Sequence, residues 1–574
     1  MKTPPLAVLL LVTTLPLSAA RDRSPQHAPP EAYLPGDPLP YFGSENPWDQ
    51  RWFFTPVLQE TRAGQRAQLL LLEGRAAEAE RFCRARLAEF PLELESHFNL
   101  AVALAALGRT DEAGAALAGA LDLGLPPSRV LAGPRAQLAP LRATPAYRRA
   151  REACQGLVHG PLLGAVTPAA ARFWVRTEEE SAVEVRLSRT GDFAAPEARG
   201  TARTRARDDY TAVVAVDGLA ARTPYLYQIY LDGRPVPRDE VWRFVTPPPE
   251  AAPGPVRVAF GGCAQYEPAR ERIWDTIRLR RPDAFLLMGD NVYVDLPRAI
   301  GPFHRYTYYQ RQSRPEFRRL TAGVPVYAFW DDHDAGIDDV FLGPYPDRPA
   351  WKLEWFHHFR ENWNNPAYGG APEHPGLWHR FRIGPVECFM LDGRYYRENF
   401  LKPNPSMLGP VQKAWLLQSL RESTAPFKLL VSPVAWADDA KIEQTSWGEA
   451  IPAQDIWSGY RAEREEIFAF LADHHIGGVL LLSSDRHRHD VRLNRRARGY
   501  PLLEFESGWL TNETGTEGSG RPLFEYLDGP AFGFFTFDAS GPAPGARFEL
   551  VNADGEAVYR RDVPLAELTD AAQP

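Results

Sequence analysis

The sequence predicts a multidomain α+β fold, in which a short α-helical repeat block, a β-sandwich and an α/β domain succeed one another. Three observations predict it. Apolar residues recur with helical spacing over residues 61–152 and alternate as in strands over 157–248. From 254 to 565, apolar runs alternate with helical stretches, which indicates an α/β sheet domain. At 574 residues the chain is also too long for one core.

The first 60 residues are expected to lie outside these domains. Lys2 precedes an apolar run from Leu6 to Leu17, and small residues come next up to Ala20, which is the pattern of a secretory signal peptide at residues 1–20. An arginine pair is missing, which favours Sec-type export to the periplasm or the medium. Residues 21–60, rich in proline and aromatic residues, predict an extended arm. No later apolar run approaches the roughly 20 residues of a membrane span.

The helical block contains an internal repeat. Gly74 and Glu78 recur 34 residues later as Gly108 and Glu112, and this resembles the period of tetratricopeptide repeats. Two repeats are few for an independent solenoid, so we expect the block to pack on the domain next to it in the chain. Its role is either a docking surface for a protein partner or a structural appendage.

The alternating segment predicts a β-sandwich of the immunoglobulin or fibronectin III type. Residues 171–176, 183–187 and 225–230 alternate between apolar and polar, and Asp232-Gly233 suits a hairpin turn. Residues 219–227 resemble the Leu-x-Pro-x-Thr-x-Tyr-x-Tyr corner of fibronectin III modules, with alanine in place of the proline.

In the α/β domain, four apolar runs end abruptly in residues that can bind metal ions. They lead into Cys263, into Asp290 and Tyr293, into Asp332, and into Asp485 and His487. Because ligands gather at the carboxyl ends of parallel strands, these side chains are expected to converge. The net charge of −8, with both signs well mixed, gives no basic patch for nucleic acid. The pattern predicts a metal-dependent hydrolase.

Six motifs in this order resemble the PhoD-like alkaline phosphatase D family of the calcineurin-like metallophosphatase superfamily. They lie at residues 262–265, 289–293, 330–334, 391–397, 409–416 and 484–487. The resemblance covers residues 155–565 and includes the β-sandwich at 157–248, which is typical of that family's N-terminal part. It implies that residues 254–565 form a catalytic metallophosphatase sandwich with mixed sheets.

Beside the resemblance, the residues suggest a first metal site that suits Fe(III). Asp290 has two carboxylate oxygens and can bridge two metal ions. Tyr293 offers a phenolate, as in the similar Gly-Asp-x-x-Tyr of purple acid phosphatases. Cys263 offers a thiolate, and His487 would complete the site.

The remaining hard ligands, Asp332 and Asp485, predict a second site for Ca²⁺, Mn²⁺ or Mg²⁺. His333 is better placed to donate a proton or stabilise charge than to coordinate. Arg394 is expected to bind phosphate, with an ion-pair role as the alternative. Ser484 stands where the family commonly has glycine, so a positive φ there would strain the turn.

Together these features predict an exported phosphoric-ester hydrolase that acts on small phosphate monoesters, diesters or both. Two metal ions sharing Asp290 would activate the attacking hydroxide, and His333 would assist the leaving oxygen. The alternatives are a phospholipase or nucleic-acid phosphodiesterase, whose substrate would stack on loop tryptophans, and a non-catalytic scaffold with a degenerate phosphatase domain.

Overall fold

The computed structural model describes the chain from residue 60 to residue 570. Within this range it leaves out residues 251, 253, 296–300, 337–339, 349–350, 401, 439–442, 445–449, 452–454 and 513–520. The expected signal peptide and the expected arm up to residue 59 lie outside the described residues.

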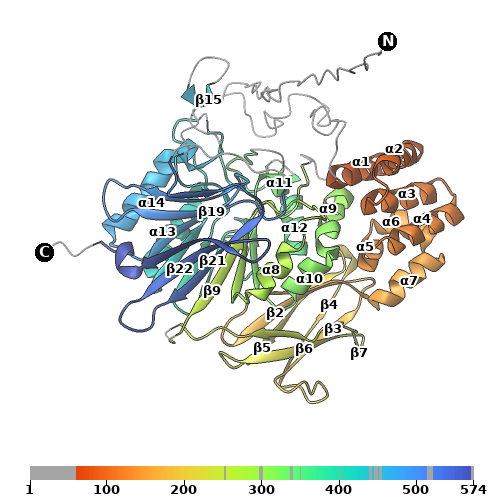
Figure 1. Cartoon of the computed structure of the whole chain (residues 1–574), viewed down its shortest axis with the longest axis horizontal. Coiled ribbons are helices and arrows are strands. Elements are labelled where there is room, and N and C mark those ends of the chain that lie inside the picture. Colours follow the sequence, from red (N-terminus) through yellow and green to blue (C-terminus); the bar gives the residue numbers. More distant parts are fainter. Residues whose placement is uncertain are drawn as a thin grey trace, which may run out of the picture.

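The N-terminal block of the described chain is formed by seven helices (Figure 1). Gly74 and Gly108, the repeated glycines, both have φ of 76° and stand between the first and second helix of each pair. Only glycine adopts this conformation freely, so each helix ends there. The tetratricopeptide resemblance itself stays a prediction. The helices are α1 (Glu60–Leu72), α2 (Ala76–Glu89), α3 (Leu94–Ala106), α4 (Thr110–Asp122), α5 (Pro127–Ala132), α6 (Arg135–Leu138) and α7 (Pro145–Cys154).

Two antiparallel sheets come next, with an apolar core that includes Phe173 and Tyr227, whose rings are 4.8 Å apart. Asp232 and Gly233 both have positive φ and form the turn between β6 and β7, as expected. The likeness to fibronectin III stays a prediction. One sheet holds β1 (Leu157–Gly164), β2 (Ala170–Thr177) and β5 (Thr211–Asp217); the other holds β3 (Ala182–Ser188), β4 (Ala198–Arg203), β6 (Pro224–Leu231), β7 (Arg234–Pro235) and β8 (Trp242–Val245).

The third part contains a six-stranded and a seven-stranded sheet. Strands β9, β10 and β11 of the first sheet are parallel, and the closing strands β21 to β23 extend it in antiparallel pairing. The orders are β11-β10-β9-β21-β22-β23 and β12-β13-β14-β17-β19-β18-β20. The first sheet comprises β9 (Val256–Gly261), β10 (Ala284–Met288), β11 (Val326–Phe329), β21 (Ala531–Asp538), β22 (Gly545–Asn552) and β23 (Ala557–Pro564).

The second sheet also has a parallel centre, formed by β13, β14, β17 and β19. The two sheets face each other across an aromatic layer, in which Phe505 of β19 packs on Phe535 of β21 with ring centroids 4.9 Å apart. Aromatic rings bury large apolar areas, so this layer joins the sheets in one core. The strands are β12 (His379–Ile383), β13 (Val386–Met390), β14 (Phe427–Val431), β17 (Val479–Ser483), β18 (His489–Asn494), β19 (Leu502–Ser507) and β20 (Phe524–Tyr526).

Helices cover this pair of sheets from two sides. Figure 1 shows α13 and α14 at one side and α8 and α10 at the other. A small separate ribbon pairs β15 (Glu443–Gln444) with β16 (Ala450–Ile451). The helices are α8 (Ile273–Leu279), α9 (Gly301–Ser313), α10 (Pro315–Thr321), α11 (Asp332–Ala335), α12 (Trp351–Asn362), α13 (Gly409–Glu422) and α14 (Arg461–Asp473).

The helical block is joined to the sheet domain through α9. Tyr306 of α9 is fully buried and belongs to the core of the block. Its hydroxyl donates to Glu95 Oε2 at 2.7 Å and accepts from Asn99 Nδ2 at 2.9 Å, both in α3. Glu95 Oε1 in turn accepts a hydrogen bond from Arg129 Nε at 2.9 Å. The block therefore shares a buried polar network with the sheet domain.

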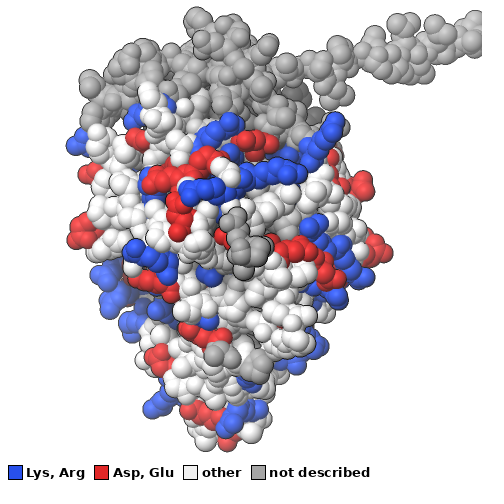
Figure 2. All heavy atoms as spheres, turned by 90° about the vertical axis from the view of Figure 1, so that its left-hand side faces the viewer, with Lys and Arg blue, Asp and Glu red and all other residues white. Residues whose placement is uncertain are grey.

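Charges of both signs are interspersed on the face drawn in Figure 2. Within the described part of the chain, every helix is too short or too polar to cross a membrane.

We expect Tyr306→Phe to lower the free energy of unfolding by about 1–3 kcal/mol, because a buried carboxylate and a buried amide each lose a partner. Urea unfolding measures the change. Tyr345→Phe, at a tyrosine that is 48% exposed, is the control and should leave the stability unchanged. Equal stability of both variants would contradict the structural role of this network.

Candidate metal centre

The predicted ligands lie together because their strands end at a common edge. Cys263 comes after β9, Asp290 after β10, Asp332 after β11, and Asp485 after β17. The strand ends approach closely at two glycines. A Cβ at Gly262 would lie 2.1 Å from Ser484 Oγ, and one at Gly289 would lie 2.5 Å from Asp331 Cβ. Glycine at these two positions allows the backbones to meet.

Among the residues that the structure describes, three groups of side chains could each hold a metal ion, and within each group the potential ligand atoms lie within 4.8 Å of one another. Asp290 belongs to two of the groups, and so does Asp332. The groups are Cys263, Asp290 and His487; Asp290, Asp332 and His333; and Asp331, Asp332 and Asp485. The predicted ligands thus lie close enough together to hold neighbouring ions.

Tyr293 lies against the first group. Its hydroxyl donates to Asp290 Oδ2 at 3.0 Å and lies 3.2 Å from His487 Nε2. Asn512, in the loop after β19, donates to the same hydroxyl at 2.7 Å and lies 3.1 Å from His487 Nε2. Burial and the nearby Asp290 charge raise the pKa of Tyr293 well above its usual range. A cation at this position would offset that effect and favour the phenolate.

The backbone of the ligand residues is strained. Four of the six predicted metal ligands have positive φ: Cys263 (57°), Asp290 (50°), Asp485 (74°) and His487 (48°). Such conformations cost energy in non-glycine residues and are concentrated at functional sites. The φ of Ser484 is not positive. The serine that replaces the family's glycine is therefore not the strained residue of this turn.

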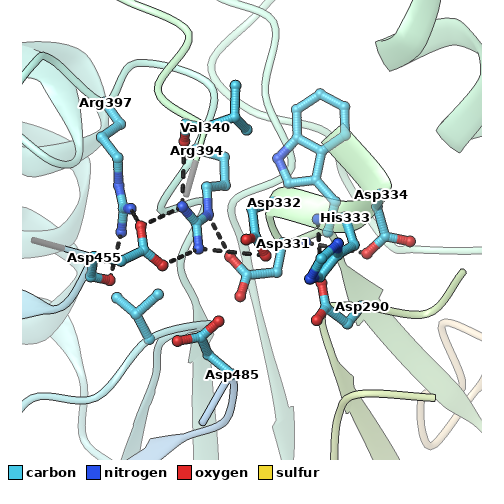
Figure 3. Close-up of polar contacts among 12 residues, drawn as sticks. Asp290, Asp331, Asp332, His333, Asp334, Val340, Arg394, Arg397, Asp455 and Asp485 are labelled. Carbon is cyan, nitrogen blue, oxygen red and sulfur yellow. Dashed lines mark hydrogen bonds and ion pairs between the residues drawn. The ribbon is translucent and has the colours of Figure 1, made fainter. Parts of the chain in front are cut away.

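Arg394 is fully buried and lies among ion pairs with the carboxylates (Figure 3). Its Nε donates to Asp331, its Nη1 to Val340 O and Asp455 Oδ1, and its Nη2 to Asp455 Oδ2. Four of the five N–H groups of Arg394 thus donate to the protein, which favours the ion-pair alternative, in which Arg394 orients the carboxylates. Phosphate binding by Arg394 stays a prediction.

His333 lies at the other end of the carboxylate cluster. Its Nδ1 is 2.5 Å from Asp295 Oδ1, and its backbone N–H donates to Asp290 Oδ1 at 3.3 Å. Burial alone lowers the pKa of His333, but the charges of Asp295, Asp332 and Asp290 outweigh burial and raise the pKa well above its usual range. These carboxylates favour the protonated form of His333 in the metal-free protein, and the contact with Asp295 holds the ring in place.

The electrostatics of the cluster fit bound cations. Burial and neighbouring carboxylates raise the pKa of Asp290 and of Asp485 well above the usual range. For Asp331, burial raises the pKa to about 6 although Arg394 opposes it. Asp331 Oδ2 is buried without a hydrogen-bond partner within the described structure. Buried carboxylates that repel one another need positive charge to ionise together, and metal ions would supply it.

Sequence reasoning missed four residues of the site. Asp331 directly precedes a predicted ligand, and Asp295 lies five residues after Asp290, so proximity in sequence was a usable signal for both. Asp455 and Asn512 lie in loops without such a signal.

Comparison with known proteins shows what this chain is similar to. Residues 258–521 match the family described as PhoD-like phosphatase. The match includes most of β9, all of β10 and β11, and the strand ends that carry the candidate ligands. Residues 154–249, which contain the two antiparallel sheets, match a separate family described as a domain of unknown function, DUF7800.

The chain is also similar to individual phosphatases. Alkaline phosphatase D of Bacillus subtilis is 22% identical over 331 residues, which are 50% of this chain and 55% of that protein. The chain thus matches about half the length of this curated relative. The solved structure of PhoD has a TM-score of 0.57 at 17% identity and covers 71% of this chain and 91% of its own. A purple acid phosphatase from yellow lupin seeds has a TM-score of 0.50 at 12% identity and covers 71% and 75%. The two structures show a shared fold and support the mixed α+β, multi-sheet prediction.

Chelator-treated protein should lose stability as the pH rises, because the folded state binds protons that the unfolded state has released. The stability that Asp331 contributes is lost between about pH 4, near its ordinary pKa, and its raised pKa of about 6. Asp331→Asn is permanently neutral and keeps the size of the protonated acid. We expect its stability relative to the parent to increase by a few kcal/mol between pH 4 and pH 7. Urea unfolding at both pH values measures this, and a constant difference would contradict the raised pKa.

Proposed function

We propose that this chain is a metal-dependent phosphoric-ester hydrolase that acts on phosphate monoesters, diesters or both. The observation that carries the proposal is the overlap of three potential ligand groups through Asp290 and Asp332, within a PhoD-like phosphatase domain. Shared carboxylates hold neighbouring ions close together, which is the arrangement that two-metal phosphatases use for in-line displacement.

The candidate ligands of the first ion are Cys263, Asp290, Tyr293 and His487. A thiolate and a phenolate are strong charge donors, which supports Fe(III) at this position. Asp332 and Asp485, with Asp331, offer oxygen ligands, which supports Ca²⁺, Mn²⁺ or Mg²⁺. Bound metal ions would act as Lewis acids. They would activate water and offset the charge on the phosphate oxygens.

The chain's own residues would do three things. Asp455 holds Arg394, and Arg394 holds Asp331, so that the carboxylates keep their positions during the reaction. The deep burial of Asp290 and Asp332 keeps bulk water away from them. His333, held by Asp295 through Nδ1, would assist the leaving oxygen as a proton donor.

The tryptophans bear on the phospholipase or nucleic-acid phosphodiesterase alternative. Four of the tryptophans that could stack a base or a lipid are buried, so they pack inside the domain, which favours small esters. They are Trp355, Trp363, Trp436 and Trp457. The site geometry weighs against the non-catalytic scaffold, because a degenerate domain would not need to retain the ligand groups. Export stays a prediction from residues 1–20, and a protein partner of the helical block stays a prediction as well.

We expect the protein to hydrolyse p-nitrophenyl phosphate, its bis ester, or both, and Asp290→Asn to reduce the turnover by about 100-fold or more. The substitution removes charge from two ligand groups at once, so metal content should fall too. Turnover and elemental analysis measure these effects, and circular dichroism checks the fold. An Asp290→Asn variant within about tenfold of the parent would rule out the shared carboxylate.

We expect purified native protein to absorb visible light through charge transfer from Tyr293 to Fe(III), and Tyr293→Phe to abolish that band. Tyr308→Phe is a suitable control, since this tyrosine is buried on α9 outside the three ligand groups. An iron-free, colourless and fully active enzyme would overturn the assignment of iron.

A further inference from the structure

The N-terminal helical block reaches into the phosphatase site. Arg62 of α1 is 9% exposed and forms an ion pair with Asp295, whose side chain is fully buried. Asp295 Oδ2 faces Arg62, and Asp295 Oδ1 lies 2.5 Å from His333 Nδ1. One carboxylate therefore connects a helix outside the phosphatase domain to the residue directly after a predicted metal ligand.

A second contact fixes the loop that carries Tyr293. Gln65, one turn after Arg62 on α1, donates its Nε2 to Tyr293 O at 2.5 Å, and Arg62 Nη1 donates to the same carbonyl at 3.3 Å. Arg62 Nη1 also donates to Gln65 Oε1 at 3.1 Å, which holds the two side chains together. The rings of Tyr293 and His333 stack with centroids 4.3 Å apart.

We propose that Arg62 is a positioning residue of this phosphatase site: it holds Asp295, and Asp295 orients the imidazole of His333. The inference rests on the proposed function for the role of His333, and on the contacts alone for the position of Asp295.

The physical reason is the cost of a buried carboxylate. Asp295 is withdrawn from water, so its charge must be balanced within the protein. Arg62 supplies a permanent positive charge on one oxygen, which leaves the other oxygen directed at His333 Nδ1. Because a carboxylate–imidazole contact sets both the ring orientation and the nitrogen that carries the proton, loss of Arg62 would release the ring.

The helical block can deliver Arg62 accurately because it is itself anchored. Tyr306 and Tyr309 of α9 belong to the core of the block, and Tyr306 bonds to Glu95 and Asn99. The block is thus a fixed part of the wall beside His333, whether or not it also docks a partner.

The test uses variants of the full-length protein with metal at saturation. Arg62→Ala should lower kcat by about 10- to 100-fold with KM changed less than about threefold, and Arg62→Lys should restore part of the loss because it returns the charge without the fork of donors. The double variant Arg62→Ala/Asp295→Asn should lose no more than Asp295→Asn alone, since both changes break one chain of contacts. Additive losses would overturn the proposal.

The matched control is Gln68→Ala, also a buried polar side chain of α1, whose amide donates to Gln137 within the block at 2.8 Å. It should keep the parent's kcat. Hydrogen exchange monitored by mass spectrometry is a readout independent of turnover. Residues 290–295 and 332–336 should exchange faster than in the parent in Arg62→Ala, and at the parent's rate in Gln68→Ala. If the parent hydrolyses no phosphate ester but this exchange pattern appears, the proposed function fails and the positioning contact stands. Full kcat and unchanged exchange in Arg62→Ala would overturn the inference alone.

Discussion

The repulsion among buried carboxylates is the constraint on which the site depends. Asp290, Asp331, Asp332 and Asp485 converge at the strand ends with almost no exposure of the first three, and each neighbouring charge raises the cost of ionising the others. Arg394 balances part of that charge from one side. Cations held by these carboxylates would offset the remaining charge, so the electrostatics that would destabilise the metal-free cluster would also provide the affinity for metal.

The fold brings these charges together through close backbone approach. Gly262 and Gly289 leave room for Ser484 and Asp331, and the residues after them take left-handed conformations that aim their side chains at one point. The strands behind the site hold this strained geometry, because their apolar side chains form the core between the two sheets. Stability of the core and precision of the site are therefore connected: the packing energy of the sheets is what keeps the ligand residues in unfavourable backbone regions.

The charged groups that hold the carboxylates come from distant parts of the chain. Arg394, itself held by Asp455, fixes Asp331 from one side, and Arg62 fixes Asp295 from the other. The two arginines act on opposite ends of the cluster, and neither is itself a predicted metal ligand. On this proposal, the geometry of the site within residues 258–521 depends on α1 (Glu60–Leu72), a helix far earlier in the sequence.

The succession of helical, antiparallel and parallel segments, and the strand ends at which the candidate ligands lie, could be predicted from the sequence alone. Asp290 and Cys263 come just after apolar runs, so local pattern and strand-end position were enough to predict them. The tertiary structure decided what Arg394 does, because its partner Asp455 lies 61 residues away, and it decided the role of Arg62, whose contact with Tyr293 spans 231 residues. Ion pairs of this kind leave no periodic trace in sequence; they exist only once packing has withdrawn both charges from water.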